Sequence, residues 1–195
     1  MSAKLPSKRV VVGITGASGA PYAKRLVSVL EARAASRGDV ELAVCLSSTA
    51  PEVWTLECGG DIREAFRSKI WGGRDYGAPF ASGSAGWQAM VVVPCSMSTV
   101  ARIAHGISDS LLTRAADVML KEKRQLIVVP RESPLSVVHL ENLTTVARAG
   151  ALVMPASPGF YNKPADIGDL VDGVVARILD HLGLDHDLSK RWGQP

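Results

Sequence analysis

Short apolar runs rich in valine and isoleucine recur along this chain, and segments of helical periodicity alternate with them. The runs are Val10–Ile14, Val40–Leu46, Met90–Val93, Leu126–Val129 and Ala151–Met154. The helical segments are Pro21–Arg37, Ser98–Ala104, Leu111–Lys121, Val138–Ala149 and Ile167–Leu182. Short runs of this kind are typical of strands that are buried on both faces. The alternation therefore predicts an α/β fold, a three-layer sandwich with helices on both faces of a mostly parallel sheet.

The last helical segment has the most regular pattern, because its apolar residues follow one another at intervals of three or four from Ile167 to Leu182. We expect this stripe to face the core. The stretch Ser47–Ala89 is irregular, so we expect short helices and loops that could cover a ligand. With 195 residues, 47% of them hydrophobic, the chain is predicted to form one domain, 1–195. Its tail, from about residue 183, is expected to pack over the site or a neighbouring subunit.

Charge and cysteine content exclude several classes of protein. The net charge of +3 is spread along the sequence, which is unlike the clustered basic residues of a nucleic-acid-binding protein. Cys45, Cys58 and Cys95 are odd in number and form no C-x-x-C pair, which argues against a disulfide framework or a zinc site. No apolar run reaches the ~18 residues of a membrane span. We expect a cytoplasmic protein that binds a small anionic ligand.

A glycine-rich turn follows the first predicted strand and reads Gly13-Ile-Thr-Gly16-Ala17-Ser18-Gly19. The free amides of a helix N-terminus after such a turn favour an anion such as phosphate. The spacing is neither that of a dinucleotide fingerprint nor that of a Walker loop. The second strand ends in Leu46-Ser47-Ser48, without the acidic residue that binds an NAD ribose. We therefore favour a mononucleotide, and the alternative is a structural turn without a ligand.

Small polar side chains also follow the third run, in Pro94-Cys95-Ser96-Met97-Ser98-Thr99, and Arg131-Glu132 follows the fourth. The carboxyl ends of parallel strands meet at one edge of the sheet, where ligands of open α/β folds bind. Here a cation such as Arg131 can hold phosphate and a carboxyl group such as Glu132 can move a proton. Cys95 is better explained by packing than as a nucleophile, since no histidine lies near it in sequence.

Three further groups have both a structural and a functional interpretation. Arg114, Asp117 and Lys121 lie on one stripe of a helix and could form a surface salt-bridge ladder. Tyr161 could donate to a ligand oxygen or belong to a simple turn. The four histidines show neither metal-ligand spacing nor a triad partner, so no metal site is predicted.

Together these motifs resemble the flavin prenyltransferases of the UbiX type. The matching segments are Thr15-Gly-Ala-Ser-Gly19, Pro94-Cys-Ser-Met97, Arg114-Ala-Ala-Asp-Val118, Lys121-Glu122, Val129-Pro-Arg-Glu132, His139-Leu-Glu-Asn142, Pro158-Gly-Phe-Tyr161 and Arg191-Trp-Gly193. The resemblance implies a flavodoxin-like or Rossmann-like sheet and assembly into homododecamers. It also implies metal-independent transfer of a dimethylallyl group from dimethylallyl phosphate to N5 and C6 of reduced FMN. The product, prenylated FMN, would pass to a UbiD-type decarboxylase.

The resemblance also assigns roles to single residues, which we treat as expectations. FMN would contact Gly16, Ala17, Ser18, Ser47, Ser96, Met97, Ser98, Thr99 and Arg131. Dimethylallyl phosphate would contact Lys121, Tyr161 and Arg177, with Arg114 nearby and Tyr76 as an aromatic wall. Glu132 and Lys121 would act in catalysis, and Ser18 with Glu57 would form a relay near N5 of the flavin. A neighbouring subunit could contribute Arg131-Glu132.

Two positions depart from the family pattern, and two other functions stay open. Tyr76 stands where tryptophan is frequent, which bears on the choice between a monophosphate and a diphosphate donor, and Ser98 replaces a common lysine, which bears on FMN affinity. The alternatives are an FMN-dependent decarboxylase and a non-catalytic flavin carrier subunit of an aromatic-acid decarboxylase system. The decarboxylase hypothesis predicts a Pro-x-Met-Asn pattern, which the loop Pro155–Gly159 lacks. The pathway, ubiquinone biosynthesis or aromatic-acid decarboxylation, also stays open.

Overall fold

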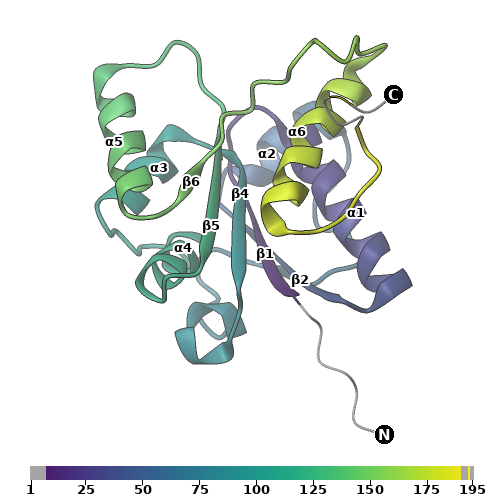
Figure 1. Ribbon diagram of the computed structural model, residues 1–195. Coiled ribbons are helices and arrows are strands. Elements are labelled where there is room, and N and C mark those ends of the chain that lie inside the picture. Colours follow the sequence, from purple (N-terminus) through teal and green to yellow (C-terminus); the bar gives the residue numbers. More distant parts are fainter. Residues whose placement is uncertain (1–7, 190–192, 194–195) are drawn as a thin grey trace, which may run out of the picture.

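Six parallel strands form one central sheet in a computed structural model that describes residues 8–189 and 193 (Figure 1). The strands are β1 (Lys8–Ile14), β2 (Val40–Leu46), β3 (Ile70–Trp71), β4 (Ala89–Cys95), β5 (Gln125–Pro130) and β6 (Leu152–Val153). The helices are α1 (Ala20–Arg37), α2 (Ala50–Cys58), α3 (Met97–Ala104), α4 (Leu111–Lys121), α5 (Val137–Arg148) and α6 (Ile167–Leu182), with short 3₁₀ helices at Pro79–Ala81 and Gly83–Ala85. Arg191 and Trp192, from the last matching motif, lie outside the described residues.

Both faces of the sheet are buried, which explains why the strands read as continuous apolar runs. In β1, Val10 and Val12 belong to the core on one face, and Val11 belongs to the core on the other. Helices α1, α2 and α6 cover the first face, and α3, α4 and α5 cover the second (Figure 1). The predicted three-layer α/β fold is therefore confirmed. In the described part of the chain, no helix is both long and apolar enough to cross a membrane.

Two details differ from the sequence predictions. Strand β3 lies in the irregular stretch and was not expected there, because a run of two residues shows no periodicity. Ile167, the first residue of the predicted core stripe of α6, is 77% exposed, whereas Val174 and Ile178 further along the helix are buried. The stripe therefore faces the core only after the first turn of α6.

The strand order is β3-β2-β1-β4-β5-β6. From β1, the chain adds β2 and β3 on one side and then β4, β5 and β6 on the other, so the switch point lies between β1 and β4. In open α/β sheets, ligands bind in the crevice outside the carboxyl ends of the strands at such a point. Thr15, which is buried, joins the two loops that leave these strands. Its Oγ1 donates to the Pro94 carbonyl over 2.7 Å and accepts from the Ser96 amide over 2.9 Å. The Thr15 hydroxyl therefore fixes the loop after β1 relative to the loop after β4, and these two loops form the walls of the crevice.

Candidate active site

The N-terminus of α1 is closed by a carboxylate of the chain itself. The glycine-rich turn ends at Gly19, whose φ of 121° favours glycine, and α1 has no N-cap hydrogen bond from the side chain before it. Glu57, near the end of α2, takes that place. Its carboxylate accepts from the Gly19 amide over 2.8 Å and from the Ala20 amide over 2.7 Å. Two of the amides that the sequence analysis assigned to a phosphate are therefore already occupied.

Glu57 forms a polar group with Ser18 and Arg131. Partial burial acts to raise the pKa of Glu57, but hydrogen bonds from the Ser18 hydroxyl and the two amides, together with the charge of Arg131, hold it below its ordinary value. Glu57 is therefore an anion near neutral pH, and the Ser18 hydroxyl donates to it. The structure brings the predicted Ser18–Glu57 pair together, and it places Arg131 of the same chain beside them. Tyr22 is also close to Arg131, although burial dominates there and raises the pKa of Tyr22.

A cleft of about 390 Å³ opens at the same edge of the sheet, and we call it the hydroxyl cleft. The Ser96 side chain caps α3 by accepting from the Thr99 amide over 3.3 Å, so the N-terminus of this helix borders the cleft. Ser96 Oγ also lies 3.1 Å from Ser98 Oγ and 3.0 Å from Thr99 Oγ1. Hydroxyls can donate as well as accept, so these groups can turn toward an anion. Further lining groups are Ser47, Thr49, Thr113, Arg74 and Arg102.

The hydroxyl cleft fits a phosphate in charge and in shape. A helix N-terminus and two guanidinium groups face it, and its one acidic residue, Asp109, pairs with Arg102 over 3.1 Å. A Cβ at Gly16 would overlap with the Thr49 side chain, so the turn needs glycine at this position. Met97 is only 4% exposed and packs in the core, so its side chain does not face the cleft.

Sequence reasoning missed Arg74 and Arg102 as members of this cleft. Arg102 has a recognisable signal, because it lies one helical turn after Ser98 on α3 and donates to the Ser98 carbonyl over 3.2 Å. Arg74 gives no such signal, because the loop after β3 has no regular pattern. Only the fold brings these two cations to the same cleft.

A second cavity, of about 630 Å³, lies against α6, and we call it the α6 cavity. Its lining includes Tyr161 and Arg177, so the structure brings together two of the predicted donor-binding residues. Asp180 and His186 line it too, and neither was among the predicted site residues. Asp180 could have been found as the i+3 partner of Arg177, but His186 carries no signal in the sequence.

The segment after α6 contributes His186 and Ser189 to the α6 cavity. These residues belong to the tail that we expected to pack over the site. Residues 190–192 and 194–195 of that predicted tail lie outside the described residues.

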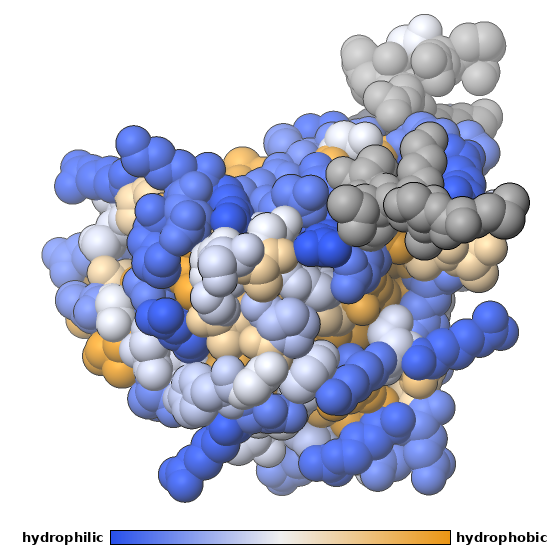
Figure 2. All heavy atoms as spheres, turned by 90° about the horizontal axis from the view of Figure 1, so that it is seen from below, coloured by the Kyte–Doolittle hydropathy of each residue, from blue (hydrophilic) through white to orange (hydrophobic). Residues whose placement is uncertain are grey.

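Lys121 lies at the amino edge of the sheet, opposite the carboxyl edge where the hydroxyl cleft opens. Strand β5 begins at Gln125, four residues after Lys121, and ends next to Arg131. Its six residues span about 17 Å. Figure 2 shows the amino edge, seen from below the view of Figure 1, with hydrophilic residues around the rim and residues of intermediate to high hydropathy in the middle. Lys121 lies on α4, which covers the opposite face of the sheet from α6, and it lines neither pocket. Within one chain it therefore does not contact a ligand held by Tyr161 and Arg177, although we expected all three to bind the same donor.

Neither pocket is lined by Arg114, Lys121, Tyr76 or Glu132. Arg114 donates to Asp117 over 3.3 Å and to the Ala81 carbonyl over 3.2 Å, and Lys121 pairs with Glu122 over 2.5 Å. The first of these contacts is one rung of the predicted salt-bridge ladder. Tyr76, in the loop after β3, is 49% exposed. Glu132, directly after Arg131, is exposed and accepts from the Ser133 amide over 3.1 Å.

Known proteins resemble this chain over nearly its whole length. The model of the Flavoprotein family matches residues 1–179. The flavin prenyltransferase UbiX of Thermoplasma acidophilum is 48% identical over 186 residues, which are 94% of this chain and 99% of that protein. The solved structure of AnUbiX in complex with FMN and dimethylallyl pyrophosphate is 40% identical, with a TM-score of 0.88 over 96% of this chain and 98% of that chain. A dodecameric FMN-dependent UbiX-like decarboxylase from Escherichia coli is also 40% identical, with a TM-score of 0.89 over 95% and 100% of the two chains. This chain therefore belongs to the Flavoprotein family and, within it, to the UbiX-type flavin prenyltransferases.

Proposed function

We propose that this protein transfers the dimethylallyl group of dimethylallyl phosphate to N5 and C6 of reduced FMN, which yields prenylated FMN and phosphate. The observation that carries the proposal is the hydroxyl cleft, which is lined by a helix N-terminus, several hydroxyls and two guanidinium groups. The Ser18–Glu57 pair lies at the same carboxyl edge of the sheet. This arrangement suits a flavin mononucleotide with its phosphate in the cleft and its ring toward Glu57. Relatives of 44% and 48% identity named flavin prenyltransferase UbiX support the same activity.

Two sets of residues are assigned to the flavin. The phosphate is bound by Ser47, Ser96, Ser98 and Thr99, and Gly16, Ala17, Ser18 and Arg131 contact the rest of the molecule. Met97 contributes through its backbone, because its side chain lies in the core. Arg102, one turn after Ser98, supplies the positive charge that a lysine would bring at position 98.

Reduced FMN, when bound, supplies the electron-rich N5 and C6 positions that accept the prenyl group. The ionised Glu57 receives the proton of the Ser18 hydroxyl in a hydrogen bond, so the Ser18 lone pairs are free to accept from an N–H donor of a ligand. Because the pKa of Glu57 lies below its ordinary value, this carboxylate orients Ser18 and is a poor proton store at neutral pH. Glu132, which is exposed next to Arg131, is assigned the role of general acid and base.

Donor binding is assigned to Tyr161 and Arg177 in the α6 cavity. Their N–H and O–H groups stabilise the negative charge that grows on the phosphate as its bond to carbon breaks. Lys121, Arg114 and Tyr76 lie away from this cavity, so we assign them to the site of a neighbouring copy of the chain. The dodecameric relative supports an assembly in which one copy completes the site of another.

The activity is tested by anaerobic incubation of the purified protein with reduced FMN and dimethylallyl phosphate, followed by mass spectrometry of the flavin. We expect a flavin heavier by one prenyl unit. Arg177→Ala should bind FMN normally and prenylate it far more slowly. If FMN binds and its mass stays unchanged with both the monophosphate and the diphosphate donor, a carrier or decarboxylase function replaces this proposal. If FMN does not bind, the assignment of the hydroxyl cleft is wrong as well.

The shared site is tested by combining two inactive variants in one assembly. Lys121→Ala and Arg177→Ala chains, each impaired alone, are produced together in equal amounts. If the two residues come from different copies, about a quarter of the mixed sites hold both intact side chains, and activity returns to that fraction. If both residues act from one chain, the mixed assemblies stay as inactive as their parents.

We further propose that the prenylated FMN serves a UbiD-type decarboxylase and that the protein works in the cytoplasm. Its three cysteines are free, which is consistent with a reducing compartment. A purified UbiD-type apoenzyme that gains decarboxylase activity only after addition of the reaction product would support the first point.

A further inference from the structure

Asp180 lies in the wall of the α6 cavity between Arg177 and His186. Arg177 Nη1 donates to Asp180 Oδ2 over 2.8 Å, and His186 Nε2 lies 3.2 Å from Asp180 Oδ1. Each carboxylate oxygen therefore meets a different partner, and the two contacts together fix the plane of the carboxylate.

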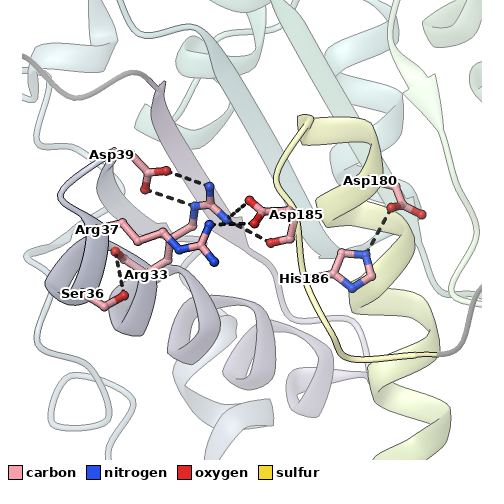
Figure 3. Close-up of polar contacts among 7 residues, drawn as sticks. All are labelled: Arg33, Ser36, Arg37, Asp39, Asp180, Asp185 and His186. Carbon is pink, nitrogen blue, oxygen red and sulfur yellow. Dashed lines mark hydrogen bonds and ion pairs between the residues drawn. The ribbon is translucent and has the colours of Figure 1, made fainter.

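His186 is itself held in place. Its side chain is only 4% exposed, and its Nδ1 accepts from the Leu188 amide over 3.3 Å. Because Nδ1 is an acceptor, the neutral ring carries its proton on Nε2 and donates it to Asp180. Asp185, the residue before His186, attaches the same segment to α1, as Figure 3 shows. Asp185 there accepts from Arg33 over 2.7 Å and from Arg37 over 2.6 Å.

We propose that Asp180 and His186 are positioning residues that hold the Arg177 guanidinium toward the α6 cavity, ready for the phosphate of the prenyl donor. The inference rests on the proposed function and adds to it the two residues that act through Arg177.

Arg177 needs such a support. Its side chain is 59% exposed on the surface of α6, where a long side chain samples several rotamers. A guanidinium has five N–H donors in a rigid plane, so the bond to Asp180 fixes its direction and leaves the other donors for a phosphate. A cation that is oriented before the ligand arrives loses less entropy on binding. His186 contributes by holding Asp180 from the side away from Arg177.

Helix α6 also supplies a matched control. Asp172 lies on the same helix, its side chain is 21% exposed like that of Asp180, and it likewise accepts from an arginine, Arg25, over 2.6 Å. Asp172 does not line the α6 cavity. Loss of its carboxylate therefore reproduces the loss of an ion pair on α6 without affecting the donor site.

The test is steady-state prenylation by the full-length protein with Asp180→Asn, His186→Gln and Asp172→Asn. We expect Asp180→Asn to raise KM for dimethylallyl phosphate and to lower kcat/KM roughly ten-fold, while the dissociation constant of FMN stays unchanged. His186→Gln should show the same pattern to a smaller extent, and it provides the measurement if Asp180→Asn does not fold. Asp172→Asn should leave both constants at the wild-type values.

A double-mutant cycle separates positioning from a general structural effect. In an Arg177→Ala background, Asp180→Asn should cause no further loss of kcat/KM, because the residue through which it acts is gone. Equal losses in both backgrounds, or an equal rise in the FMN dissociation constant, would overturn the inference. If the wild-type protein does not prenylate FMN at all, the proposed function has failed. If the wild-type protein prenylates FMN and Asp180→Asn does so with the same KM and kcat/KM, only the positioning role has failed.

Discussion

Replacing Thr15 by valine removes one oxygen atom at the point where the two walls of the flavin crevice meet. The change conserves the shape of the side chain but removes the hydroxyl that bridges the loops after β1 and β4. The Pro94 carbonyl keeps a second donor, the Thr15 amide at 3.3 Å, so it remains paired. The Ser96 amide loses the acceptor that now lies 2.9 Å away.

The cost can be worked out from these contacts. Leaving the partly buried Ser96 amide without its protein partner costs about 1–3 kcal/mol, and losing the 2.7 Å bond to Pro94 adds about 1 kcal/mol. We therefore expect Thr15→Val to lower the free energy of unfolding by roughly 2–4 kcal/mol. For a domain of this size, each kcal/mol lowers Tm by about 2–4 °C, so Tm should fall by roughly 4–16 °C. FMN should also bind more weakly, because Ser96 lines the hydroxyl cleft.

The assay is thermal unfolding at one fixed protein concentration, so that assembly does not shift Tm between samples. Thr145→Val is the control, because its hydroxyl donates to the Glu141 carbonyl over 2.9 Å on the exposed side of α5 and joins no loops. We expect its Tm to stay within 1–2 °C of the wild-type value. A Thr15→Val protein with the Tm and FMN affinity of the control would refute the argument that this hydroxyl holds the crevice together.

Three further predictions concern single sites. Glu57→Gln should lower Tm at pH 7, and the difference from wild type should shrink as pH falls below the ordinary carboxyl pKa of 4.5, because a carboxylate with a lowered pKa stabilises the fold only while it is ionised. Gly16→Ala should weaken FMN binding at least ten-fold, measured by fluorescence titration, because the added methyl group overlaps a neighbouring threonine and displaces the turn. In the folded protein, a thiol reagent should modify Cys58 and spare Cys45 and Cys95, because burial raises the pKa of Cys45 to about 12 and raises that of Cys95 as well. Fast reaction of all three thiols without denaturant would contradict this.

The layers of the fold could be predicted from sequence because burial on both faces leaves a direct trace. A strand such as β4, in which every residue is buried, appears as an uninterrupted apolar run. Strand β3 leaves no such trace because its two residues are too few to show a period. Ile167 has the spacing of a core residue, but the first turn of α6 extends beyond the residues that it packs against.

The candidate site could be predicted in part. Residues directly after a strand, such as Ser96 and Arg131, could be placed because the carboxyl ends of parallel strands meet at one edge. The contact of Glu57 with the Gly19 amide joins residues 38 positions apart and follows from no local pattern. The position of Lys121 could have been deduced. A helix that connects parallel strands runs back along the sheet, so its last residue lies at the edge where the next strand begins.

The carboxylate at the start of α1 decides which way round a ligand can bind. The N-termini of α1 and α3 both lie at the carboxyl edge of the sheet, and each would attract a phosphate. Glu57 supplies an anion to the first of them, so a phosphate that approached it would meet a charge of its own sign. Among the residues that the structure describes, the N-terminus of α3 carries no such carboxylate, and it borders the hydroxyl cleft together with Thr49 and Ser110, the N-cap residues of α2 and α4. Repulsion at α1 as well as attraction at α3 therefore favours one orientation of a molecule that has a phosphate at one end and a ring at the other, and it disfavours the reversed orientation.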